Sequence, residues 1–209
     1  MNQSNSKLRY LLSLCLISVL IGCSQKSPQV TKVEPDITEI EPQTSELAGE
    51  QPITRQADYQ QGLEALALRD YGKAKRLFTG FIKANPRLSG AYVNLALIAF
   101  REDNFDSAEK LVQQAIVLNP EQAQAYHLRA QLHLKKGAIK LAQADYQKAL
   151  ELKPDYINAH HNLALLYDIF LQEIALAIDH YTKYLSLLEK EDEKTRNWVK
   201  HLQGTLDNG

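Results

Sequence analysis

Apolar, small and polar positions recur along this chain with a period of 34 residues. Prolines mark the period most plainly, because Pro86, Pro120 and Pro154 lie 34 residues apart. Proline has no backbone N–H to donate and restricts the residue before it, so each of the three should follow the end of a helix. A period of this length predicts one helical hairpin that has been copied and stacked on its neighbours.

Small and large side chains alternate in the same register within each copy. Alanine stands twelve residues before each proline, at Ala74, Ala108 and Ala142. A larger apolar residue stands eight before each proline, at Phe78, Val112 and Tyr146. Small residues are needed where two helices approach closely, and large ones where the space between them must be filled. The pattern therefore predicts two packed helices in each copy.

This arrangement resembles the tetratricopeptide repeat, and residues 89–122 carry the resemblance most fully. The matching residues are Tyr92, Leu95, Ala96, Ala108, Ala115 and Pro120. The resemblance implies an all-α fold, in which about four helical hairpins stack into a right-handed superhelix with a concave inner face. The expected hairpins span residues 55–88, 89–122, 123–156 and 157–191.

The two ends of the repeat region should differ from its middle. The first copy lacks the usual larger apolar residues at three positions, Asp58, Gln61 and Ala65, as expected of a terminal repeat with one exposed side. Residues 192–209 place three apolar side chains on one helical face, namely Trp198, Val199 and Leu202. We interpret this segment as a capping helix. The alternative is that Trp198 anchors a partner.

The fourth copy contains one extra residue. Ala177 follows His160 by 17 positions, whereas Ala108 follows Tyr92 by 16. We expect the insertion in the turn at residues 171–173. Because no proline closes this copy, its second helix should continue to about residue 188.

The N-terminus has the pattern of a secretory signal. Lys7 and Arg9 precede an apolar run over residues 11–21, which is shorter than the roughly 20 residues that a spanning helix needs. The run ends in Leu-Ile-Gly-Cys and resembles a bacterial lipobox, which implies a signal peptide over residues 1–22 and a lipid on Cys23. The alternatives are an uncleaved anchor or an ordinary signal. Because Ser24 stands where aspartate would favour inner-membrane retention, we expect the outer membrane of a diderm envelope, with the protein facing the periplasm.

Residues 23–54 should form a disordered tether after the lipidated cysteine. Between Ser24 and Thr54 lie four prolines and six acidic residues, against two lysines and no aromatic residue. Such a segment cannot bury enough apolar surface to offset the entropy lost on ordering. A solvated spacer is the favoured interpretation, and an acidic partner motif is the alternative.

Charge and candidate chemistry narrow the function further. The whole chain carries a net charge of −1, and no basic stripe suited to nucleic-acid phosphates is evident in its sequence. No two of the six histidines are three or four residues apart, as zinc ligands on one helix would be. Glycine-rich phosphate loops and nucleophile elbows are also missing from the sequence. We therefore expect no enzyme, no cofactor, no metal and no small-molecule substrate.

The inner wall of such a fold is lined by the first helix of each hairpin. The period assigns to this wall Tyr59, Leu63, Val93, Leu97, Phe100, His127, Gln131, His161 and Leu165. An apolar peptide or an amphipathic helix would suit it. The alternative is that some of these side chains pack between neighbouring repeats. A clamp for acidic tails is not expected, because Val93 removes a lysine and leucines stand at polar positions of that clamp.

Anchor, tether and repeats together indicate a membrane-anchored scaffold that binds a protein or peptide partner in an envelope assembly. The chain resembles small lipoproteins of the pilotin type, which assist pilus or secretion pores. One alternative is an adaptor that docks cell-wall hydrolases or synthases. An alternative of another class is an enzyme that uses tyrosine or histidine on the inner wall.

Overall fold

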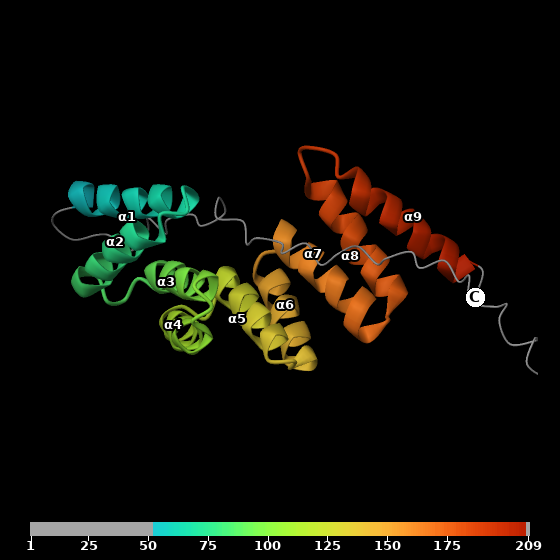
Figure 1. Ribbon diagram of the computed structural model, residues 1–209, viewed down its shortest axis with the longest axis horizontal. Coiled ribbons are helices and arrows are strands. Elements are labelled where there is room, and N and C mark those ends of the chain that lie inside the picture. The colour runs from blue at the N-terminus through green and yellow to red at the C-terminus, as the bar shows by residue number, and fades with distance from the viewer. Residues whose placement is uncertain (1–51, 208–209) are drawn as a thin grey trace, which may run out of the picture. The chain divides into compact units, whose positions relative to one another are not determined.

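The computed structural model describes residues 52–207, and all regular structure within them is helical (Figure 1). The predicted signal peptide, Cys23 and nearly all of the predicted tether lie outside the described residues. The helices are α1 (Pro52–Ala67), α2 (Tyr71–Ala84), α3 (Ser89–Arg101), α4 (Phe105–Leu118), α5 (Ala123–Lys135), α6 (Ile139–Leu152), α7 (Ile157–Leu165), the π-helix η2 (Leu166–Leu171), α8 (Ile174–Leu187) and α9 (Glu193–Asp207).

Consecutive helices pair into hairpins, and each hairpin packs on the next. The pairs are α1/α2, α3/α4, α5/α6 and α7/α8, and the second helix of each contacts the first helix of its successor (Figure 1). The second helices α2, α4 and α6 end at Ala84, Leu118 and Leu152, two residues before the three periodic prolines. The predicted all-α stack of helical hairpins is thereby confirmed.

The alternating small and large residues form the buried core of this stack. The periodic alanines of α2, α4, α6 and α8 are completely buried, and the large residues four positions later are buried beside them. These pairs are Ala74 with Phe78, Ala108 with Val112, Ala142 with Tyr146, and Ala177 with Tyr181. The first hairpin needs glycine at position 62, because an added Cβ would lie 2.8 Å from the Phe78 ring. The distance between two packed helices therefore determines how large a residue can be at each of these positions, as the pattern predicted.

The helix ends follow from local chemistry. Asp70 begins α2 by accepting a hydrogen bond from the Lys73 backbone N–H at 2.9 Å, and Asn104 begins α4 by accepting one from Ser107 at 3.2 Å. Such caps satisfy N–H groups that the helix itself cannot pair. α1 begins at Pro52, inside the segment predicted as tether. Proline is tolerated in the first turn of a helix, because the backbone N–H groups there have no acceptor within the helix.

The extra residue of the fourth hairpin lies in a helix and not in the following turn. Each turn between paired helices has one residue with left-handed backbone, and these are Arg69, Asp103, Gly137 and Gln172. In the first three hairpins a backbone bond closes the turn across five residues, as from Asp70 N to Ala65 O at 2.8 Å. In the fourth, Glu173 N reaches back six residues to Tyr167 O at 3.0 Å. The insertion therefore widens the helix into η2, because a π-turn absorbs one residue while the turn keeps its left-handed residue.

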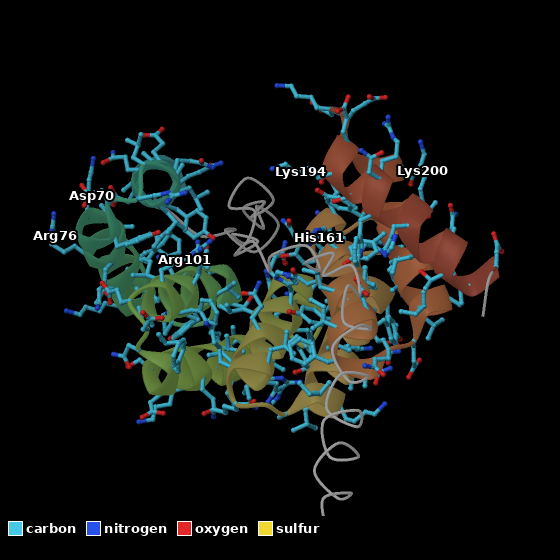
Figure 2. The ribbon with its side chains drawn as sticks, turned by 45° about the vertical axis from the view of Figure 1, so that its right-hand side comes forward. Asp70, Arg76, Arg101, His161, Lys194 and Lys200 are labelled. Carbon is cyan, nitrogen blue, oxygen red and sulfur yellow. The ribbon has the colours of Figure 1, made fainter. Side chains whose placement is uncertain are left out.

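α9 covers the end of the stack. Val199 and Leu202 are buried in the core shared with α8, and Trp198 Nε1 donates a hydrogen bond to Asp168 Oδ2 at 2.7 Å. Lys194 and Lys200 point outward (Figure 2). The predicted capping helix is confirmed. Among residues 52–207, no helix combines the length and apolar character needed to cross a bilayer.

Candidate peptide-binding face

The nine residues predicted for the inner wall come from the first helices α1, α3, α5 and α7, and most are buried. Seven have less than a tenth of their surface exposed, namely Tyr59, Val93, Leu97, Phe100, His127, Gln131 and His161. Leu63 and Leu165 are half-buried. The alternative of packing between repeats thus describes the buried positions, because α3 contacts α5 and hydrogen bonds join α1 to α3 and α5 to α7. Peptide binding by this face stays a prediction. Leu63 and Leu165 are the most accessible of the nine residues.

Matched pairs of residues join the first helices of successive hairpins. Asn94 Nδ2 donates to Tyr59 Oη at 3.1 Å between α3 and α1. Asn162 Nδ2 lies 2.9 Å from His127 Nε2 between α7 and α5. The corresponding residues between α5 and α3 are Leu128 and Val93, both apolar and buried. Both asparagines therefore join neighbouring first helices.

His127 is the most completely enclosed histidine in the described part of the chain. Its ring lies 4.9 Å from that of Tyr156 and 5.5 Å from that of Tyr146, and its exposed fraction is 1%. Burial disfavours the charged form and lowers the pKa of His127 to about 4. The side chain is therefore neutral at pH 7. A neutral imidazole accepts the Asn162 amide hydrogen at Nε2.

Two buried polar atoms on this face have no hydrogen-bond partner among the described residues. They are Gln131 Oε1 and His161 Nδ1. His161, labelled in Figure 2, lies on α7 with its ring 4.7 Å from the Tyr184 ring, and burial lowers the pKa of its imidazole. Leaving such a buried polar atom without a partner costs about 1–3 kcal/mol of stability.

Tertiary structure also assembles groups that sequence spacing could not indicate. His160 Nδ1 and His180 Nδ1, twenty residues apart, lie at 3.0 Å. Arg129 donates two hydrogen bonds to the Asp145 carboxylate, at 2.8 and 2.6 Å, and links α5 to α6. A search by i to i+4 spacing misses both pairs, because each joins two different helices. In the described part of the chain, no three or more histidine, cysteine or acidic residues are grouped to hold a metal ion.

Family models match two segments of the chain. A tetratricopeptide repeat model matches residues 65–132, and a TPR repeat model matches residues 134–168. Together with the stacked hairpins, these matches identify the chain as a tetratricopeptide repeat protein. No curated protein matches it.

Solved structures share the fold at low sequence identity. A thermophilic TPR protein of Thermus thermophilus, TTC0263, is 22% identical with a TM-score of 0.60, over 74% of this chain and 84% of that one. Pseudomonas aeruginosa pilF is 18% identical with a TM-score of 0.64, over 74% and 69%. The first TPR of Spaghetti (RPAP3), solved with the HSP90 peptide SRMEEVD, is 24% identical with a TM-score of 0.52, over 56% and 95%. At these identities the likeness is one of fold.

Proposed function

We propose that this protein is a membrane-anchored scaffold that binds a protein or peptide partner in an envelope assembly, such as pilus or secretion pore biogenesis. The observation that carries the proposal is the stack of tetratricopeptide hairpins that follows a lipobox-like sequence at Cys23. Repeats of this family are typically non-catalytic scaffolds for protein–protein interaction. We accordingly propose no enzymatic activity for it.

The anchor supports a role at a membrane surface. Acyl chains on Cys23 would hold the protein there, because each buried methylene contributes about 0.8 kcal/mol. Tethering raises the local concentration of the repeats and favours weak contacts with partners at the same membrane. The outer membrane, facing the periplasm, is the proposed location, since Ser24 follows the cysteine. The fold shared with pilF is compatible with this proposal without carrying it.

The half-buried leucines of the first helices supply the test of partner binding. Aspartate at Leu97 or Phe100 would test folding instead, because both side chains are buried. We therefore choose Leu63→Glu and Leu165→Glu, at half-buried positions of α1 and α7. Val117→Glu is the matched control, because Val117 lies on α4 with 66% of its surface exposed.

The experiment is a pull-down from envelope extracts with the lipidated full chain, followed by deletion of the gene. We expect specific partners to be lost from the Leu63→Glu/Leu165→Glu protein and kept by Val117→Glu, and we expect an envelope assembly to fail on deletion. Partners that remain bound to the double variant would place binding elsewhere. Unchanged pilus, secretion and wall assembly in the deletion strain would reject the envelope role.

A further inference from the structure

The fourth hairpin brings two imidazole nitrogens face to face. His160 on α7 and His180 on α8 place their Nδ1 atoms 3.0 Å apart, and their ring centroids are separated by 5.2 Å. His160 Nε2 lies 2.9 Å from the carbonyl oxygen of Pro154. A carbonyl can only accept, so His160 carries its hydrogen on Nε2. Its Nδ1 therefore presents a lone pair to His180.

This arrangement is confined to one hairpin of the stack. In the second hairpin Tyr92 occupies the place of His160, and its hydroxyl donates to the Pro86 carbonyl oxygen at 3.2 Å. The bond to the proline carbonyl is thus kept, while the imidazole adds a second polar atom that faces the partner helix. The position of His180 is taken by Leu111 and Asp145 in the two preceding hairpins.

We propose that His160 and His180 form a binding site for a divalent transition-metal ion of the Cu²⁺ type, through their two Nδ1 atoms. Metal–imidazole bonds are about 2.0–2.1 Å long. With nitrogens 3.0 Å apart, such bonds enclose an angle of about 95° at the metal. That angle is close to the right angle of square-planar or tetragonal sites, which favour Cu²⁺ or Ni²⁺, and smaller than the tetrahedral angle that zinc prefers.

The groups around His160 and His180 also suit a pair of metal ligands. Metal-bound histidines usually donate their other ring N–H to a backbone carbonyl or a carboxylate, as His160 does to Pro154. The Tyr167 ring stacks on His180 at 5.6 Å, and its hydroxyl accepts hydrogen bonds from Gln143 and Gln147 at 3.2 and 3.1 Å, which fixes that ring.

Access and charge also bear on binding. His180 is partly exposed, so an ion can approach from solvent. Burial disfavours positive charge at the pair and Lys183 opposes it as well, whereas Asp155 and Asp179 partly offset both effects. Among the described residues no group of three or more histidine, cysteine or acidic side chains could hold a metal ion, so water would complete the coordination of an ion bound by this pair. To bind, His180 must move its ring hydrogen from Nδ1 to Nε2, which replaces its hydrogen bond to His160 Nδ1 by the bond to the metal.

The test is a Cu²⁺ titration of the full chain at pH 7.4, with Cys15→Ser and Cys23→Ser introduced so that thiols do not compete for the ion. Affinity is measured against a chromophoric chelator, and the copper environment by electron paramagnetic resonance. The variants are His160→Gln and His180→Gln. His201→Gln is the matched control, because His201 is exposed on α9.

We expect one bound Cu²⁺ with nitrogen hyperfine coupling, and an affinity at least about tenfold weaker in either pair variant than in the His201→Gln control. Equal affinity in all the proteins, or a copper spectrum that lacks nitrogen coupling, would overturn the proposal. Circular dichroism checks that each variant is folded. His180→Gln keeps the test decisive if the more buried His160→Gln unfolds the hairpin.

Discussion

At the scale of single residues, the junctions between hairpins follow a rule of matched polarity. Tyr59 meets Asn94 at the first junction and His127 meets Asn162 at the third, whereas the second has an apolar residue at both positions. Replacing both members of a buried hydrogen-bonded pair by apolar groups can be nearly neutral, but removing one leaves the other unsatisfied. Each junction therefore constrains pairs of residues and not individual ones.

A double substitution tests this rule. Asn162→Leu alone should destabilise the protein by about 1–3 kcal/mol, because His127 Nε2 loses its donor. His127→Val together with Asn162→Leu reproduces the Val93 and Leu128 pair of the second junction and should recover most of that loss. Urea unfolding of the two single variants and the double variant measures the coupling. Strictly additive losses would show that the two side chains act independently.

The same histidine makes stability depend on pH. Folding lowers the pKa of His127 from its ordinary value of 6.5 to about 4, so the unfolded chain binds more protons between these values. The contribution of His127 to the free energy of unfolding should be fully present above about pH 6.5. It should fall by up to about 3 kcal/mol as the pH drops towards about 4. Burial also lowers the pKa values of His160, His161 and His180, which contribute in the same direction.

Denaturant midpoints at pH 7.5 and pH 5 measure this dependence. The His127→Val/Asn162→Leu protein should lose clearly less stability between the two pH values than the parent. An identical pH dependence in both proteins would mean that His127 is not the acid-sensitive group.

At the scale of elements, the π-helix η2 has a definite consequence for the end of the stack. Asp168 lies within η2 and accepts hydrogen bonds from Trp198 Nε1 at 2.7 Å and from the Tyr181 hydroxyl at 3.3 Å. Its equivalents in the two preceding hairpins are Leu134 and Phe100, which cannot accept a hydrogen bond through their side chains. The element that absorbs the inserted residue thus also holds the capping helix.

Removing this contact should loosen α9. Asp168→Ala should lower the free energy of unfolding by about 1.5–3 kcal/mol, because hydrogen bonds to charged groups are worth about that much. The Trp198 fluorescence should shift to the red as water reaches the indole. Trp198→Phe is the matched partner, and the double variant should be little worse than either single variant. Unchanged fluorescence in Asp168→Ala would show that α9 does not depend on this bond.

At the scale of the whole molecule, contacts within residues 52–207 run between neighbouring hairpins and the cap. In such arrays stability is approximately a sum of repeats and their interfaces, and terminal repeats need a polar outer side. α9 supplies this side at one end, since it buries Val199 and Leu202 and exposes Lys194 and Lys200.

Anchoring is the prediction that concerns the molecule as a whole. Cys23→Ser should move the protein from the membrane fraction to the soluble periplasmic fraction, because the acyl chains would have no attachment site. Fractionation with metabolic labelling by a fatty acid measures this outcome. Equal labelling and membrane recovery of Cys23→Ser and the parent would reject lipidation at Cys23.

The inner face could be predicted only in part. The period correctly assigned its residues to the first helices, because it fixes which helix carries each position. It could not state exposure, which depends on how closely the next hairpin approaches, and seven of the nine side chains proved to be buried. His160 and His180 escaped prediction for the same reason, since their contact crosses from one helix to another.

The hairpins, the ends of the second helices at the periodic prolines and the presence of one inserted residue could all be predicted from the sequence, because proline, alanine and turn residues act on the backbone within a few positions. Tertiary structure alone decided where that insertion is accommodated. The turn before α8 keeps its left-handed residue, Gln172, so the extra residue enters the helix and forms η2. It also decided which polar residues meet across junctions, because packing brings together residues that are 20 to 35 positions apart.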